Sequence, residues 1–129
     1  MRVIKVKPME EPEVKDIEND LGVLQSEVGG YIQCVYPFDE PVGIVCNDEG
    51  KLMGLPLNRS LRDENGEMYD IIAGNFLIVG LTEDDFGSLT DEQVEKYSNM
   101  YKDIEVFFRD EPANEHCKAT RNEWDYDRR

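Results

Sequence analysis

The residues best equipped to hold a ligand lie in one short segment, PLNRSLRDE, between two predicted turns. Arg59 and Arg62 stand three positions apart, with Asn58 directly before the first of them. Two guanidinium groups and a carboxamide present N–H donors in fixed planes, which suits an anion such as a phosphate. Tyr69 follows as a ring on which a planar ligand can stack, and Asn47 ends the preceding predicted strand. These five residues are the candidate ligand-binding set.

The same arginines also have a simpler interpretation. Asp63, Glu64 and Asp70 follow closely in the sequence, and their carboxylates can neutralise the two guanidinium groups. Ion pairs of this kind are common in loops and contribute little individually. In that case the arginines only stabilise the position of this segment through ion pairs. The sequence leaves both interpretations open.

Residue types typical of catalysis are not arranged for it. His116 is the single histidine and adjoins Cys117, and neighbouring side chains on an extended segment point apart rather than converge. The run Glu83 to Asp85 lacks the alternating spacing and the glycine of a calcium loop. Gly29 and Gly30 follow a predicted helix, whereas a phosphate-binding glycine loop precedes one. We therefore expect a binding protein that is not an enzyme, with no catalytic residues, cofactor or metal.

Composition narrows the classes of partner. The chain has 129 residues, enough for one domain, and a formal net charge of −15. Direct nucleic-acid binding needs clustered Lys and Arg, and the sequence shows no such cluster. A membrane span needs a long apolar stretch, and the sequence shows none. The three cysteines show no CxxC spacing, so neither a disulfide framework nor a zinc site is indicated. We expect a cytoplasmic protein that binds neither membranes nor nucleic acids.

The strongest strand pattern lies before the arginine segment. Residues 42–47 are rich in β-branched side chains and apolar on both faces, which is typical of a strand buried in a sheet. A turn at 47–50 ends in glycine, and we expect residues 51–55 to return as the second arm of a hairpin. Pro56 then breaks the pattern, and residues 58–62 are expected to form at most one helical turn.

A second turn is predicted at Asp63 to Gly66, where Asn65-Gly66 is a strong turn signal. Tyr69 to Ile72 should follow as a strand, with a bulge at Ala73-Gly74. The run 76–79 is then expected to be a core strand.

The amino-terminal part predicts a strand at residues 3–6 that is returned by 13–17, followed by a short helix. Asn19 or Asp20 can cap this helix, and Gly29 or Gly30 can end it in the left-handed conformation. Residues 31–36 alternate as a strand. Tyr31, Tyr36 and Phe38 are interpreted as core aromatics or, alternatively, as one wall of a pocket.

A longer helix is expected from residue 91 to 108. Thr90 and Gln93 have the spacing of a capping box. Apolar residues then recur at helical spacing and should pack on the sheet: Val94, Tyr97, Tyr101, Ile104 and Phe108.

Together these elements predict an α+β fold with a mainly antiparallel sheet of five to six strands and two helices, the longer C-terminal one packed on the sheet. Residues 1–108 should form a single domain, and residues 109–129 a polar tail. Trp124 is the residue that can hold this tail against the body or against a neighbouring subunit of a homo-oligomer.

The sequence from VGGYI through LPLNR to YDIIAGNF resembles the domain of unknown function family 3846, over roughly residues 1 to 101. That family occurs in small proteins of phages, plasmids and conjugative elements of Gram-positive bacteria. The resemblance implies a protein made in the cytoplasm of a bacterial host, with an accessory or counter-defence role. It supplies no catalytic residues.

Two functions remain. In the first, the protein captures a small anionic ligand, such as a signalling nucleotide, at the crossover formed by Asn58, Arg59 and Arg62. In the alternative, it is an acidic decoy of the DNA-mimic type that inhibits a host DNA-processing or defence protein through carboxylates around Glu83 to Glu95.

Overall fold

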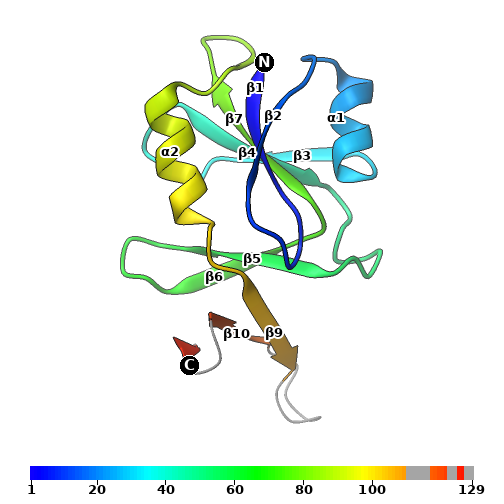
Figure 1. Cartoon of the computed structure of the whole chain (residues 1–129). Coiled ribbons are helices and arrows are strands. Elements are labelled where there is room, and N and C mark those ends of the chain that lie inside the picture. Colours follow the sequence, from blue (N-terminus) through cyan, green and yellow to red (C-terminus); the bar gives the residue numbers. More distant parts are fainter. Residues whose placement is uncertain (110–116, 122–124, 127–129) are drawn as a thin grey trace.

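The computed structural model describes residues 1–109, 117–121 and 125–126 (Figure 1). The two helices among these residues are α1 (Leu21–Val28) and α2 (Asp91–Met100). The strands are β1 (Arg2–Val6), β2 (Glu13–Asp16), β3 (Ile32–Val35), β4 (Val42–Asn47), β5 (Leu57–Arg62), β6 (Met68–Ala73), β7 (Phe76–Leu81), β8 (Phe86–Gly87), β9 (Glu105–Arg109), β10 (Cys117–Arg121) and β11 (Asp125–Tyr126).

The largest sheet has six strands in the order β2-β1-β7-β4-β3, with β8 paired to β7. All of its ladders are antiparallel. β5 and β6 form a separate antiparallel pair, and β9 pairs with β10, which pairs with β11. This arrangement confirms the α+β fold with a mainly antiparallel sheet of six strands.

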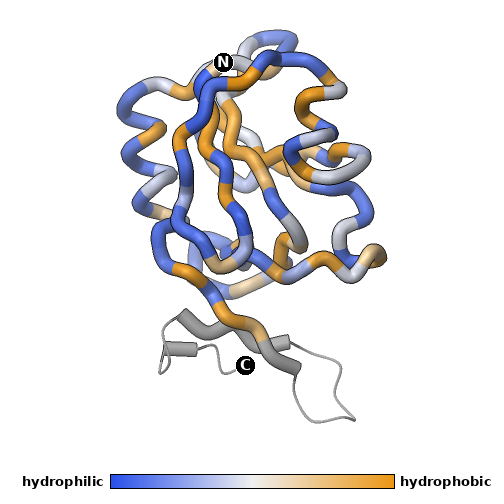
Figure 2. Tube along the Cα trace, turned by 45° about the vertical axis from the view of Figure 1, so that its right-hand side comes forward, coloured by the Kyte–Doolittle hydropathy of each residue, from blue (hydrophilic) through white to orange (hydrophobic). Residues whose placement is uncertain are grey.

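The central strands are apolar on both faces because both faces are covered (Figures 1 and 2). Ile4, Ile78 and Ile44 face each other across β1, β7 and β4 and share one buried cluster with residues of β5, β6 and α2. The alternate positions form a second cluster with Leu24 and Val28 of α1. Side-chain alternation with a period of two therefore divides one sheet between two cores.

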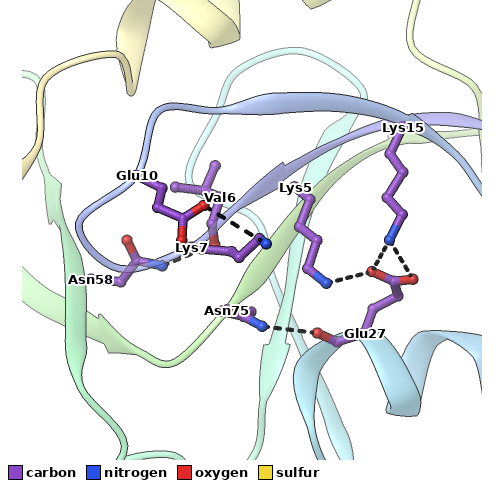
Figure 3. Close-up of polar contacts among 8 residues, drawn as sticks. All are labelled: Lys5, Val6, Lys7, Glu10, Lys15, Glu27, Asn58 and Asn75. Carbon is purple, nitrogen blue, oxygen red and sulfur yellow. Dashed lines mark hydrogen bonds and ion pairs between the residues drawn. The ribbon is translucent and has the colours of Figure 1, made fainter.

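An ion-pair cluster fastens α1 to the first two strands (Figure 3). The Glu27 carboxylate accepts from the ammonium groups of Lys5 at 2.8 Å and Lys15 at 3.0 Å. Asn75 donates to the Glu27 carbonyl at 3.4 Å. Burial raises the pKa of Glu27, but the two ammonium groups lower it by more, so the net pKa lies below the ordinary value.

Several predicted boundaries are confirmed. β4 covers residues 42–47 and is buried throughout, and β7 contains the predicted core strand. Asp20 caps α1, which ends at Gly29 with a φ of 80°. Thr90 and Gln93 form the capping box of α2.

The predicted return arm at residues 51–55 is wrong. These residues form turns, closed by hydrogen bonds such as Met53 N–H to Glu49 O at 2.9 Å and Leu55 N–H to Gly50 O at 3.0 Å. Local bonds that span three to five residues satisfy the backbone there without a partner strand.

The helical turn predicted at residues 58–62 is also wrong, because this segment belongs to β5. The hairpin is instead formed by β5 and β6 around the predicted turn, where Gly66 has a φ of 81°. Asn58 is an extra residue on β5, Tyr69 is an extra residue on β6 at the second register shift, and four consecutive residues of β5 are buried. Bulges insert extra residues, so the alternation that identifies a strand is lost.

Two further expectations are corrected. Ala73-Gly74 is the junction between two sheets rather than a bulge within one strand, because β6 pairs with β5 while β7 pairs with β1 and β4. α2 ends at Met100, and Phe108 belongs to β9 rather than to the helix.

The predicted boundary between residues 108 and 109 falls inside β9. His116 and Trp124 lie outside the described residues. Neither helix in the described part of the chain is long and apolar enough to cross a membrane.

Candidate functional site

Asn58 lies at the first irregularity of β5 and points into the protein. Its side chain is fully buried, and its amide donates to the carbonyl of Val6 at 3.0 Å (Figure 3). The same amide donates to the carbonyl of Gly74 at 2.8 Å. Asn58 therefore joins β5 to β1 and to the junction between β6 and β7.

Arg59 is also fully buried, and its donors are occupied by acceptors of the protein itself. Nε and Nη2 donate to the Tyr101 carbonyl at 3.1 and 3.0 Å, and Nη2 also donates to the Glu10 carbonyl at 2.8 Å. Nη1 donates to Asn58 Oδ1 at 2.9 Å. Because Tyr101 is the C-cap of α2, the guanidinium also meets the negative end of the helix dipole.

These contacts give Arg59 a structural role. Burial lowers the pKa of Arg59, and the buried Glu105 carboxylate counteracts this effect. Neither predicted interpretation describes Arg59, because it pairs with backbone carbonyls rather than with a ligand cavity or with Asp63, Glu64 or Asp70.

Arg62 has different surroundings although it lies on the same strand. Its Nε donates to Ser60 Oγ at 3.1 Å, and Nη1 donates to the Gly66 carbonyl at 3.0 Å. Ser60 in turn donates from Oγ to Glu105 Oε1 at 2.7 Å. No carboxylate of the described residues forms an ion pair with Arg62. Its direct partners are thus both neutral, so its charge is not directly compensated.

A cavity of about 700 Å³ opens beside Arg62, and we call it the Arg62 pocket. It lies between β5, β6, α2 and the connection from β3 to β4, and reaches the first residue of β9. The residues that give it its chemical character are Tyr36, Phe38, Ser60, Arg62, Tyr69 and Tyr97. A volume of a few hundred cubic ångströms is the ordinary size of a small-molecule site.

The predicted candidates divide between this pocket and the interior. Arg62 and Tyr69 line the pocket, and Tyr69 is 57% exposed. Asn58 and Arg59 do not line it. Tyr36, interpreted first as a core aromatic, is 64% exposed and lines the pocket, so the alternative interpretation holds for it. Tyr31 is 72% exposed, and the core interpretation is wrong for it as well.

Asn47 is a structural residue of another region. Its amide donates to the Val28 carbonyl at 3.1 Å, and its Oδ1 accepts from the Glu49 backbone N–H at 2.8 Å. A Cβ at Gly30 would lie 2.9 Å from Asn47 Nδ2, which explains the second glycine of the VGGYI motif. Asn47 lines a smaller cavity of about 170 Å³ rather than the Arg62 pocket.

One wall of the Arg62 pocket is a stack around Tyr97. The Phe38 ring lies 4.6 Å from the Tyr97 ring, and Lys96 Nζ lies 5.3 Å from the same ring. Lys96 also forms an ion pair with Glu40, whose pKa is lowered chiefly by that ammonium group. The Tyr97 side chain is fully buried, and burial together with the neighbouring Glu40 carboxylate raises the pKa of its hydroxyl.

Carboxylates outnumber cations around the pocket. Asp39, Glu40, Asp63, Glu64 and Glu105 line it, against Arg62 and Lys96. Three of the five are engaged: Glu40 by Lys96, Asp63 by the backbone N–H groups of its own turn, and Glu105 by Ser60. The carboxylate oxygens of this lining can accept hydrogen bonds from a ligand. They also repel negative charge on a ligand, except for one anionic group placed at Arg62.

Sequence reasoning missed Ser60, Lys96, Tyr97 and Glu105 as pocket residues. Tyr97 was recognised only as a core position, because its spacing in the helical stripe is typical of a buried face. Ser60 and Glu105 are 45 positions apart, and no local pattern joins them. Within the described residues, no group of three or more His, Cys, Asp or Glu side chains is arranged to hold a metal ion.

Comparison with known proteins gives one result. The family model described as Domain of unknown function (DUF3846) matches residues 1–102. No curated protein and no solved structure matches the chain. The family match covers the six-stranded sheet, both helices and the β5–β6 hairpin, and the chain therefore belongs to the DUF3846 family.

Proposed function

We propose that this protein is a non-enzymatic binding protein that captures a small anionic ligand, such as a signalling nucleotide, in the Arg62 pocket. The observation that carries the proposal is the Arg62 guanidinium at the pocket wall, whose direct partners, Ser60 and Gly66, are neutral. A guanidinium in this state retains its charge for an anionic group of a ligand.

The rest of the pocket supports a ligand with a planar ring. Tyr36 and Tyr69 are both exposed and line the pocket, so their faces are available for stacking. Asp39 and Glu64 are exposed carboxylates at the same pocket and can accept from amino or hydroxyl groups of the ligand. A nucleotide with one phosphate group combines these features, whereas a triphosphate would bring more negative charge than Arg62 and Lys96 can balance.

Asn58 and Arg59 serve this function indirectly. They hold β5 against β1 and the end of α2, and so fix the strand from which Arg62 and Ser60 reach the pocket. A protein that only captures its ligand needs a fitted cavity and no nucleophile or base. The proposed setting is a phage or other mobile element in the bacterial cytoplasm, where capture of a host signalling nucleotide would counter a defence response.

The test is isothermal titration calorimetry of the purified protein with AMP, cyclic AMP and a cyclic dinucleotide. We expect at least one of them to bind, and Arg62→Ala to weaken that binding about tenfold or more, because a charge-assisted hydrogen bond is lost. Lys102→Ala, which removes an exposed positive charge outside the pocket, is the matched control. Equal affinity of wild type and Arg62→Ala, or no binding of any probe, would overturn the proposal.

A second candidate is the acidic decoy. It is favoured by a run of exposed carboxylates from the β7–β8 turn into α2, namely Glu83, Asp84, Asp85, Asp91, Glu92 and Glu95. Such a surface suits a basic protein that ordinarily binds nucleic acid. If this candidate is right, neutralising these carboxylates abolishes inhibition of the host protein, and Arg62→Ala leaves it intact.

A further inference from the structure

Two cations of the described residues line the Arg62 pocket, and only one of them keeps its charge for a ligand. The Lys96 ammonium forms an ion pair with Glu40 and also lies 5.3 Å from the centre of the Tyr97 ring. Arg62 forms no ion pair with a carboxylate of the described residues. An anionic group of a ligand therefore meets one positive charge, that of Arg62.

The Arg62 guanidinium is held by two neutral acceptors and keeps part of its donors. Nε donates to Ser60 Oγ at 3.1 Å, and Nη1 donates to the Gly66 carbonyl at 3.0 Å. A guanidinium has five N–H donors in one plane, so three of them form no hydrogen bond with a described residue. Two such donors can bind two oxygens of one anionic group side by side.

Ser60 adds no O–H donor for the ligand. Its hydroxyl donates to Glu105 Oε1 at 2.7 Å, and its backbone N–H donates to the same carboxylate at 3.3 and 3.2 Å. Glu105 thus fixes the Ser60 hydroxyl as an acceptor for Arg62. Glu105 is itself buried and lines the pocket, so it also contributes a negative charge to the lining.

The other carboxylates of the pocket limit how much negative charge a ligand can carry. Asp39, Asp63 and Glu64 line the pocket, and no cation of the described residues pairs with them. The attraction of a ligand to Arg62 grows in proportion to the ligand's charge, and the repulsion by these carboxylates grows in the same way. The cost of removing the ligand from water grows with the square of its charge. A second negative charge is therefore disfavoured.

We propose that the Arg62 pocket selects a phosphodiester over a phosphomonoester. A phosphodiester carries one negative charge on two terminal oxygens, which matches one guanidinium with two adjacent free donors. A phosphomonoester carries a third terminal oxygen and nearly a second charge, for which the described residues offer no free cation. This inference rests on the proposed capture function and narrows its ligand to a nucleotide whose phosphate is esterified twice, as in a cyclic nucleotide or a dinucleotide.

The experiment compares AMP with the methyl ester of its phosphate group on wild type by calorimetry. The two ligands share the same nucleoside and differ in one methyl group and one negative charge. At about pH 8 we expect the methyl ester to bind about tenfold more tightly than AMP, which corresponds to about 1.4 kcal/mol.

The pH dependence separates the charge from the methyl group. The second ionisation of a phosphomonoester has a pKa of about 6, so AMP carries mostly one negative charge at about pH 5. We expect the affinity for AMP to rise about tenfold from the higher to the lower pH, because the singly charged form then prevails. The methyl ester has no ionisation in this range, so its affinity should stay level and serve as the control for titration of the protein.

Glu64→Gln tests the contribution of the lining. Glu64 is exposed at the pocket, and its neutralisation should bring the two affinities closer by about threefold, because one repulsive charge is removed. A lost hydrogen bond to the shared nucleoside would change both affinities equally and leave their ratio intact. Glu18→Gln is the matched control, because Glu18 is exposed and does not line the pocket. It should leave the ratio as in wild type.

The outcomes separate the two proposals. If the ligands bind and require Arg62, but AMP binds as tightly as its methyl ester or shows no dependence on pH, the selectivity is overturned and the capture function stands. An equal affinity ratio in Glu64→Gln and Glu18→Gln also overturns it. If only a cyclic dinucleotide binds, its linear form, which ends in a phosphomonoester, takes the place of AMP in the same comparison. If wild type binds no nucleotide, both proposals fall.

Discussion

Arg59 and Arg62 are three positions apart on one strand, yet they have opposite surroundings. Arg59 is fully buried and donates to three acceptors of the protein, the carbonyls of Tyr101 and Glu10 and the side chain of Asn58. Arg62 lines a cavity with neutral partners. Burial, rather than residue type, separates the structural arginine from the candidate ligand-binding one.

This difference predicts opposite effects of two similar substitutions. We expect Arg59→Ala to lower the free energy of unfolding by about 3 kcal/mol or more, because it leaves buried carbonyls without donors and removes a cation that favours the buried Glu105 carboxylate. Arg62→Ala should lower it by less than about 1 kcal/mol, since the bond to Gly66 is exposed and Ser60 Oγ keeps its bond to Glu105. Urea unfolding of the two variants measures both values. An Arg59→Ala protein as stable as wild type would show that the hydrogen bonds of the buried Arg59 guanidinium do not stabilise the fold.

At the scale of elements, Glu27 makes the attachment of α1 depend on pH. Its pKa in the folded protein lies below 4.5, because the effects of Lys5 and Lys15 outweigh that of burial. A depressed carboxylate pKa contributes stability above the unfolded-state value, and that stability is lost as the pH falls through the folded value. We therefore expect Glu27→Gln to be less stable than wild type by about 1–2 kcal/mol near neutral pH, and the difference to vanish under strongly acidic conditions.

Urea titrations over the pH range test this expectation. Glu18→Gln is the control, because Glu18 is exposed and outside the cluster. A stability difference between wild type and Glu27→Gln that does not change with pH would contradict the role of the ionised carboxylate.

Gly74 sets the junction between the β5–β6 hairpin and the main sheet. Its φ is 85°, and a Cβ there would lie 2.8 Å from Leu55 Cδ1. Gly66 has a similar φ of 81° but nothing within 4 Å of the same position. Both glycine-to-alanine changes should cost about 1–2 kcal/mol for the left-handed backbone. We expect Gly74→Ala to lower the free energy of unfolding, measured in urea, by more than Gly66→Ala does. Equal decreases would show that the Leu55 side chain moves away from the added Cβ without loss of stability.

The elements that could be predicted from the sequence are those with local signals. The caps at Asp20 and Thr90 use residues within three positions, and β4 has an uninterrupted apolar run. β5 could not be recognised because the extra residue at Asn58 and the four consecutive buried residues remove the alternation. α2 was predicted too long because its apolar stripe continues into the chain that forms β9, where β5 provides the contact.

The site was predictable only in part for the same reason. Arg62 and Tyr69 were found from residue type, and both line the pocket. Asn58 and Arg59 were placed with them because sequence spacing does not show which way a bulged strand points its side chains. The pocket itself unites residues of β5, α2 and the β3–β4 connection, and only the tertiary fold brings these together.

At the scale of the whole molecule, the net charge of −15 repels an anionic ligand from a distance. Salt screens that repulsion beyond about 10 Å at 0.1 M ionic strength, whereas contact with Arg62 acts at close range. We therefore expect the affinity for a nucleotide monophosphate to stay level or rise as salt increases toward physiological concentration. Calorimetry at several salt concentrations measures this. A steep fall in affinity with salt would contradict this balance, because screening would then weaken the contact with Arg62 more than it relieves the long-range repulsion.

Native mass spectrometry of the protein, purified from bacterial cytoplasm without added nucleotide, tests the central claim most directly. We expect wild type to carry a bound small molecule that is released chemically intact, and Arg62→Ala, purified in parallel, to lack it. A wild-type protein without bound mass, or the same bound mass in both proteins, would contradict capture at the Arg62 pocket.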